Sequence, residues 1–167
     1  HVNLWNTFAT RVIELHKSQV ASHDIRTTEK IGGYRDEPKF YREVSYFDKN
    51  TGNLLSRIQW ENENPDTVHS IEVNIYDKDG VLVRDYGASF LPHHRNAPIQ
   101  TLVNLHTYND GLHSIRQFDA NGDRLYEVCE GSYKGKEVQI RLFEDDLVGA
   151  SDSADELMSS PVYDACF

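Results

Sequence analysis

Histidine is the residue type in this sequence best suited to chemistry, because imidazole nitrogens bind transition metals and exchange protons near neutral pH. The 167 residues include eight histidines, at positions 1, 16, 23, 69, 93, 94, 106 and 113. His106 and His113 flank the turn-forming sequence Asn109-Asp110-Gly111, which predicts that they lie on the two strands of one hairpin.

The loop of this hairpin has two possible registers. If Asn109-Asp110 forms the loop, His106 and His113 are directly opposite each other, with Cβ atoms about 4.5–5.5 Å apart. If Asp110-Gly111 forms the loop, His113 pairs with Tyr108, and we expect the two histidines on opposite faces. The Asp-Gly pair favours the second register.

Further histidines could complete a metal site with this hairpin. His93 and His94 lie in the loop 91–96, before the strand that leads to His106. We therefore consider a copper or zinc site built from His93, His94, His106 and His113. The ring and amine of His1 could also chelate copper if the N-terminus is native. The alternative is that all of these are ordinary surface and strand histidines.

Other patterns give weaker indications of chemistry. Residues 119–123 (Asp-Ala-Asn-Gly-Asp) resemble the start of a calcium loop, but the glycine is displaced and no Glu stands at the twelfth position. A hairpin turn is the expected structure there. Residues 87–89 (Gly-Ala-Ser) lack the second glycine of a nucleophile elbow, and Cys129 lies in a strand pattern. The sequence therefore leans away from an enzyme.

The cysteine count leaves the redox compartment open. Cys129 and Cys166 form no CxxC motif, and they fit either one disulfide or two buried thiols. A disulfide would attach the end of the chain to a late strand. The chain begins at His1 rather than Met, which fits a removed signal peptide or an arbitrary starting point. We expect a periplasmic or extracellular protein.

The acidic charge is concentrated at the C-terminus. The formal net charge is −10, and residues 142–167 hold seven acidic residues and no Lys or Arg, which leaves −3 for the rest. No basic stripe is present, which argues against nucleic acid as a partner. No apolar run is long enough to span a membrane. We expect a single α+β domain over residues 1–148 and an acidic tail over 149–167, and the sequence does not show whether this tail is ordered.

Residues 3–20 have helical periodicity. The apolar stripe consists of Leu4, Trp5, Phe8, Val12, Leu15 and Val20, at spacings of three and four with Gln19 beside it. Residues 21–38 read as a polar connector. In it, Tyr34 follows Gly32-Gly33 and is a candidate anchoring aromatic.

Residues 40–143 alternate short apolar runs with Gly, Asn and Asp turns, which predicts about eight short strands. In residues 54–61, the even-numbered side chains are expected to face the core and the odd-numbered ones water. Residues 71–75 and 138–142 show the same alternation. Three turns share an aromatic residue followed by Asp, two or three further residues and then Gly, at positions 47–52, 76–80 and 118–122. This sequence pattern resembles the hairpins of YD-type repeat proteins, and the resemblance implies only that these segments are hairpins.

These observations predict an N-terminal helix packed on a curved antiparallel β-meander sheet. The leading functional hypothesis is a non-enzymatic, extracytoplasmic domain that binds a small ligand or a partner protein at its surface. The alternatives are a histidine-based copper or zinc binder, and a hydrolase-like enzyme without a recognisable motif.

Overall fold

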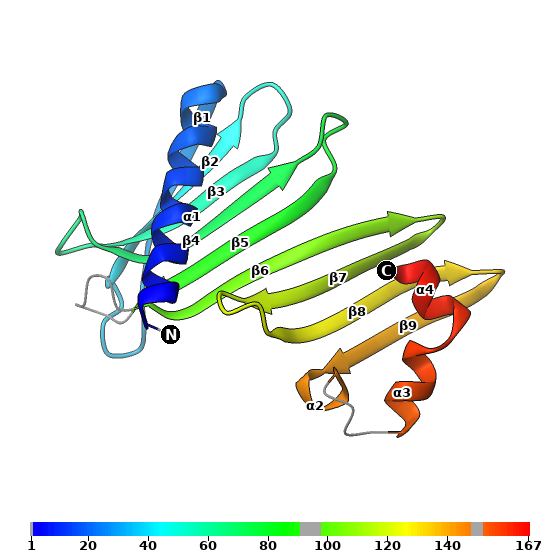
Figure 1. Cartoon of the computed structure of the whole chain (residues 1–167). Helices are drawn as coiled ribbons and strands as arrows, with labels where there is room; N and C mark the ends of the chain where they lie inside the picture. The colour runs from blue at the N-terminus through cyan, green and yellow to red at the C-terminus, as the bar shows by residue number, and fades with distance from the viewer. Residues whose placement is uncertain (1, 91–97, 148–151) are drawn as a thin grey trace. The chain divides into compact units, whose positions relative to one another are not determined.

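The structure, a computed structural model, describes residues 2–90, 98–147 and 152–167. Within these residues, an N-terminal helix precedes a nine-stranded sheet and short C-terminal helices (Figure 1). The elements are α1 (Val2–Ser22), β1 (Ile25–Gly32), β2 (Tyr41–Asp48), β3 (Leu54–Glu61), β4 (Val68–Tyr76), β5 (Leu82–Phe90), β6 (Pro98–Asn109), β7 (Leu112–Asp119), β8 (Arg124–Tyr133), β9 (Lys136–Phe143), α2 (Glu144–Leu147), α3 (Asp152–Met158) and α4 (Pro161–Cys166). The strands neighbour one another in sequence order, with β1 and β9 at the edges. The predicted α+β meander is confirmed.

The chain divides into two compact units, each of which is described by itself. Unit 1 comprises His1–Leu102 and unit 2 comprises Val103–Phe167. Over the parts of the chain that the structure describes, no helix combines the length and the apolar character needed to cross a membrane.

In unit 1, α1 covers one face of the sheet and packs on β3, β4 and β5 (Figure 1). Ala9 and Val12 are buried on the helix side that faces the sheet. Their buried partners in one apolar cluster are Ile58, Ile71, Val73, Ala88 and Phe90. The alternation in residues 71–75 therefore turns apolar side chains toward the helix, as predicted.

A β-bulge breaks the predicted alternation at the start of β3. Phe47 pairs with Leu54 and Tyr46 with Ser56, so Leu55 is an extra residue with no partner of its own. Leu55 is 3% exposed, although the alternation predicts that it faces water. The prediction was wrong at this position because a bulge turns the extra side chain out of the regular period.

Residues 21–38, predicted as a connector, contain strand β1. This strand pairs with β2 along its whole length, from Ile25 opposite Asp48 to Gly32 opposite Tyr41. Six of its eight residues are exposed. The connector prediction was wrong because an edge strand needs only backbone pairing, and its side chains can remain polar and in water.

The aspartates that begin the three hairpin turns cap the turn backbone. Oδ1 of Asp48, Asp77 and Asp119 accepts a hydrogen bond of 2.8–2.9 Å from the backbone N–H two residues further on. The glycine in each turn has φ between +77° and +87°, a region that glycine enters without steric penalty. The Asp119 segment is therefore a hairpin turn.

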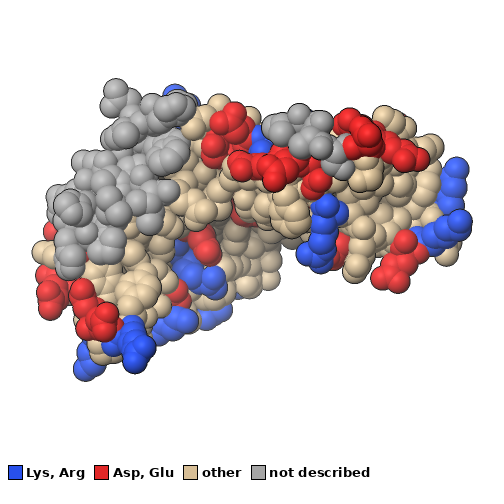
Figure 2. Space-filling view, turned by 90° about the horizontal axis from the view of Figure 1, so that it is seen from below, with Lys and Arg blue, Asp and Glu red and all other residues tan. Residues whose placement is uncertain are grey.

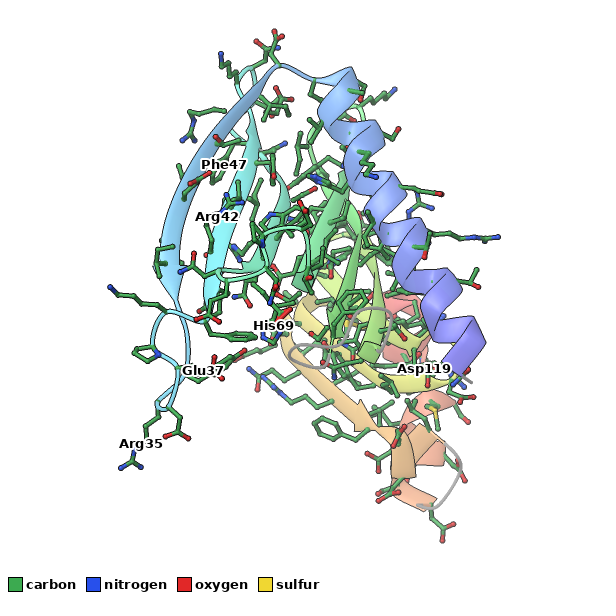
Figure 3. The ribbon with its side chains drawn as sticks, turned by 90° about the vertical axis from the view of Figure 1, so that its left-hand side faces the viewer. Arg35, Glu37, Arg42, Phe47, His69 and Asp119 are labelled. Atoms are coloured by element: carbon green, nitrogen blue, oxygen red, sulfur yellow. A yellow bond between two sulfur atoms is a disulfide. The ribbon has the colours of Figure 1, made fainter. Side chains whose placement is uncertain are left out.

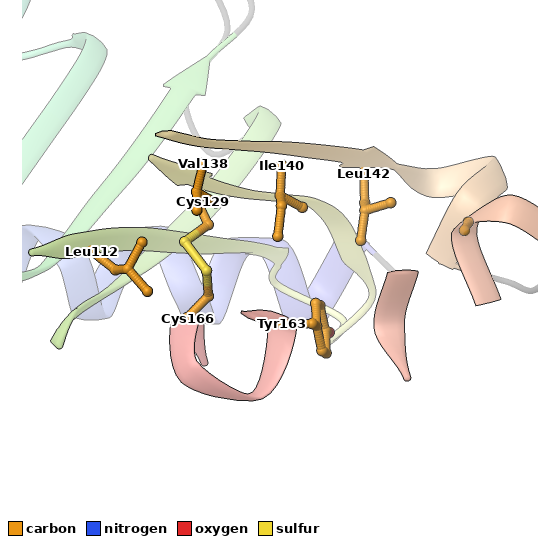
Figure 4. Close-up of a cluster of buried hydrophobic side chains, with 8 residues drawn as sticks. Leu112, Cys129, Val138, Ile140, Leu142, Tyr163 and Cys166 are labelled. Carbon is orange, nitrogen blue, oxygen red and sulfur yellow. A yellow bond between two sulfur atoms is a disulfide. The ribbon is translucent and has the colours of Figure 1, made fainter. Parts of the chain in front are cut away.

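In unit 2, the C-terminal helices cover one face of β7, β8 and β9 (Figure 4). A disulfide joins Cys129 on β8 to Cys166 on α4, which settles the pairing that the sequence left open. The buried cluster around it consists of Leu112, Val138, Ile140, Leu142, Ala154 and Tyr163. Residues 152–167 are thus ordered on the sheet, with their acidic side chains largely in solvent.

A buried carboxylate lies beside this cluster. Glu127 is fully buried on β8 and accepts a hydrogen bond of 2.6 Å from the Tyr163 hydroxyl. Arg116 and Arg124 pair with its other oxygen. Burial raises the pKa of Tyr163, and the Glu127 carboxylate raises it further. The tyrosine therefore stays protonated and donates to the carboxylate, which compensates the buried charge.

Candidate functional site

The unit 1 sheet face opposite α1 carries polar side chains at alternate positions. The alternation that turns Ile58 and Ile71 toward α1 turns Gln59 and Ser70 the other way. Ser70 Oγ donates to Gln59 Oε1 at 3.0 Å, and Gln59 Nε2 donates to Glu43 Oε1 at 3.0 Å. These side chains form a hydrogen-bonded chain across three strands, so their positions are fixed relative to one another.

Glu43 anchors this hydrogen-bonded chain. Burial alone would raise the pKa of Glu43, but the bonds from Gln59 and Lys30 lower it below its ordinary value. Lys30 Nζ lies 3.2 Å from the carboxylate. The charge of Glu43 is therefore compensated.

An open cavity of about 360 Å³ lies on this face and is called here the unit 1 cavity. It is lined by Tyr34, Gln59, His69, Ser70, Ile71, Glu72, Gly87, Ala88, Ser89, Gln100 and Leu102. Small-molecule sites usually measure about 300–1,000 Å³. A Cβ atom added to Gly87 would meet only the Ile71 carbonyl oxygen, at 3.8 Å. The missing side chain of Gly87 thus leaves the space open.

A hydrogen-bonded pair, the Tyr34 hydroxyl and His69 Nε2, stands at the wall of the cavity. Gln59 pairs with Ser70 and Trp60 with Val68, so His69 is the extra residue of a second β-bulge. His69 is 9% exposed, whereas Tyr34 is 52% exposed. The pair therefore joins a buried imidazole to a tyrosine ring that solvent can reach.

Two further aromatic rings hold the imidazole of His69. The Phe40 ring meets it edge-on with centroids 5.0 Å apart, and the Tyr41 ring is stacked at 6.3 Å. Figure 3 shows His69 beside the loop that carries Glu37, and Arg35 points away at the loop tip. The rings thus fix the imidazole by packing as well as by hydrogen bonding.

A tight loop positions Tyr34. Its backbone N–H donates to the Glu37 carbonyl at 2.8 Å, and the Glu37 N–H returns a bond of 3.1 Å to the Tyr34 carbonyl. A Cβ atom on Gly33 would lie 2.1 Å from the Glu37 carbonyl oxygen. Only glycine therefore fits next to Tyr34 without displacing the loop.

Both members of the pair are held in their neutral forms. Burial lowers the pKa of His69, which Glu61 and the Phe90 backbone oppose only in part. Burial also raises the pKa of Tyr34, and nearby Tyr41 adds to this. Nδ1 of His69 has no hydrogen bond of normal geometry within the described residues. Transfer of a proton from Tyr34 to His69 is therefore disfavoured, and the pair is joined as two neutral groups.

In unit 2, His106 and His113 lie together. β6 ends at Asn109 and β7 begins at Leu112, and Asp110 and Gly111 have φ of +42° and +84°. Asp110-Gly111 is thus the two-residue loop, which confirms the favoured register.

The expectation that this register separates the two histidines was wrong. His106 and Tyr108 are two residues apart and share a face, and the Tyr108 ring stacks on His113 at 4.5 Å. His106 therefore lies diagonally opposite His113, and its Nδ1 is 3.0 Å from His113 Nε2. Burial and the neighbouring His106 lower the pKa of His113, which favours its neutral form.

The other candidate metal ligands, His1, His93 and His94, lie outside the described residues. Over residues 2–90, 98–147 and 152–167, no three side chains of His, Cys, Asp or Glu are grouped as a metal site would require. Cys129 is buried in the disulfide.

The sequence indicates Tyr34 as a candidate anchoring aromatic, but it does not indicate His69 as the partner of Tyr34. The signal that could have suggested it is weak, since Val68-His69-Ser70-Ile71 interrupts the spacing of apolar residues by one position. Only the register with β3 shows that this interruption is a bulge.

Charged side chains on the described part of the face in Figure 2 are of both signs and intermixed.

No protein-family model, curated protein or solved structure matches the chain.

Proposed function

We propose that this chain is a non-enzymatic binding domain whose unit 1 cavity holds a small, uncharged, hydroxyl-rich ligand such as a saccharide. The observation that carries the proposal is the hydrogen-bonded Tyr34–His69 pair at the wall of a cavity left open by Gly87. A fixed polar pair next to an unfilled, ligand-sized space is the arrangement expected of a binding site.

The lining supports a ligand rich in hydroxyl groups. Amide and hydroxyl side chains of Gln59, Ser70, Ser89 and Gln100 can both donate and accept hydrogen bonds. Tyr34 adds a half-exposed aromatic ring, which can pack against the C–H face of a sugar while its hydroxyl bonds a polar rim. Glu72, the acidic side chain of the lining, is paired with Arg57 at 3.3 Å, so the lining suits a compact neutral molecule.

The state of the Tyr34–His69 pair supports binding rather than hydrolysis. Burial lowers the pKa of His69 and raises that of Tyr34, so both groups are neutral at pH 7 and suited to hydrogen bonding with an uncharged ligand. The neutral pair can still orient a ligand without reacting with it.

We also propose that the protein works outside the cytoplasm. The support is the Cys129–Cys166 disulfide, because disulfides persist in oxidising compartments such as the periplasm and the extracellular space.

Titration of the isotope-labelled full chain with glucose, galactose, N-acetylglucosamine and maltose, followed by NMR amide shifts, tests the proposal. We expect at least one sugar to shift the amides of Ser70, Gly87 and Ser89. Gly87→Leu fills the cavity at a position with room for a side chain, and it should abolish the shifts.

Tyr34→Phe keeps the ring but removes the hydroxyl, and it should weaken binding about two- to tenfold, the effect of one hydrogen bond. Tyr133→Phe in unit 2 is the matched control and should bind like the native chain. Absence of shifts with all four sugars, or equal binding by Gly87→Leu, would overturn the proposal.

A further inference from the structure

We propose that His106 and His113 bind one divalent transition metal ion, Cu²⁺ or Zn²⁺, as a two-nitrogen chelate on the face of unit 2 opposite its helices. This site is independent of the unit 1 cavity and of the sugar-binding function proposed for it.

The separation of the two nitrogens carries the inference. Two imidazole nitrogens bound to one ion at about 2.0–2.1 Å, with an angle between 90° and 109°, lie about 2.9–3.4 Å apart. His106 Nδ1 and His113 Nε2 are 3.0 Å apart. The strand register thus already holds them at the spacing of adjacent metal ligands.

The hydrogen bond between the rings does not prevent metal binding. A neutral imidazole carries one N–H, so one of the two facing nitrogens donates and the other accepts. If the donor ring moves its proton to its other nitrogen, both facing nitrogens present lone pairs. Rotation of the rings that turns both lone pairs about 35–45° off the line joining the two nitrogens then aims them at one ion, with no net loss of protons.

The surroundings hold the pair but leave it accessible. The Tyr108 ring is stacked on His113 with an interplanar angle of 2°, and both histidines are half-buried. A metal ion on this side can keep water as its remaining ligands, as ions at catalytic and surface sites do.

A nearby carboxylate adds negative charge. Glu130 on β8 is directly opposite His113, and its only ion pair among the described residues is with the exposed Arg141, at 3.4 Å. The side-chain relative exposures of Glu130 and Arg141 are 61% and 60%, so both side chains are in solvent and either can move relative to a bound ion.

Calorimetry with CuCl₂ and ZnCl₂ on the metal-stripped full chain tests the site. Electron paramagnetic resonance of the copper form counts the coordinated nitrogens. We expect one ion per chain and two imidazole nitrogens. His106→Ala or His113→Ala should each weaken binding at least about tenfold, which corresponds to about 1.4 kcal/mol. His23→Ala, which changes an exposed histidine on another part of the chain, is the matched control and should bind like the native chain.

A second variant separates this site from the other histidines. His93→Ala/His94→Ala should retain binding within about twofold, because two nitrogens of unit 2 suffice. Binding that survives loss of His106 or His113, or that disappears in the His93/His94 variant, would overturn the proposal. Thermal unfolding of the metal-free variants should match that of the native chain, since the replaced side chains lie outside the buried cluster.

Discussion

In the part of the chain that the structure describes, each unit has one sheet face without a covering helix, but the two units hold the histidines of that face in different ways. In unit 1, His69 is the extra residue of a β-bulge and is buried among aromatic rings. In unit 2, His106 and His113 occupy regular strand positions and remain half-buried. A bulge produces a dehydrated and rigid polar group, which suits selective hydrogen bonding, whereas a regular hairpin produces an accessible pair, which suits a hydrated ion.

The helical layers that cover the opposite faces also differ. α1 packs on unit 1 through apolar side chains such as Ala9 and Val12. α4 is joined to unit 2 by a disulfide and by the bond from Tyr163 to Glu127. Unit 2, which is the smaller, therefore relies on a covalent link and a buried ion network in addition to its apolar cluster.

Of the changes considered, loss of the disulfide should have the largest effect on the stability of unit 2 relative to that of unit 1. The cysteines are 37 residues apart in sequence, and a loop of that size corresponds to about 4 kcal/mol in the chain-entropy treatment. We expect Cys129→Ser/Cys166→Ser to lower the free energy of unfolding of unit 2 by about that amount. Amide exchange in β8 and β9, compared with β3 and β4, measures it. An equal fall in both units would show that the link is not a local feature of unit 2.

Glu127→Gln should have the next largest effect on stability. The amide keeps the shape of the side chain but leaves Arg116 and Arg124 without a buried anionic partner. We expect a loss of about 2 kcal/mol by denaturant unfolding. Glu130→Gln, on the exposed face of the same strand, is the matched control and should change stability by less than about 0.5 kcal/mol. Equal losses in the two variants would contradict the role given to Glu127.

The regular strands and the hairpin loop of unit 2 could be predicted from the sequence. Period-two alternation predicted the strands after β1, and Asp110-Gly111 was correctly predicted as the hairpin loop, although His106 and His113 were expected on opposite faces in that register. The features that make the unit 1 cavity could not be predicted in this way, because a bulge depends on the register between two strands. Leu55 and His69 both occupy bulge positions; the alternation assigned Leu55 to the wrong face, and the sequence indicated no particular role for His69.

Strand β1 and the packing of residues 152–167 on the sheet could not be predicted from the sequence either, because both depend on contacts between segments distant in the chain. β1 is stabilised by backbone pairing with β2, so its side chains carry no apolar period. Residues 152–167 are acidic, but three small or aromatic side chains among them are buried, at positions 154, 163 and 166. Local composition did not reveal which of these side chains meets a partner distant in sequence.

The stability of unit 1 near His69 should depend on pH. The pKa of His69 is lower in the folded chain than its ordinary value of 6.5, so the unfolded chain binds more protons between these two values. Stability from this group is present above about pH 6.5 and is lost as the pH falls toward the folded-state pKa. Amide exchange in β4 at pH 7.5 and 5.5 should show faster opening at the lower pH, and His69→Gln should flatten the difference. A profile in the native chain as flat as that of His69→Gln would contradict the buried, neutral state.

Glu130→Gln should have the smallest effect, on metal binding in unit 2. It removes one exposed negative charge opposite His113. We expect Cu²⁺ affinity to fall about threefold at low salt, in line with about 0.2–1 kcal/mol for an exposed charge pair, and less at high salt. Calorimetry at two salt concentrations measures this. Tighter binding in the variant would contradict the contribution of this carboxylate.

The most direct test of the proposed binding site is nitrogen-15 NMR of the His69 ring during titration with the four sugars at pH 7. The account predicts a neutral imidazole, with Nε2 hydrogen-bonded to Tyr34, whose ring resonances shift as a sugar saturates the cavity. A cationic imidazole, or ring resonances that no sugar moves, would contradict it.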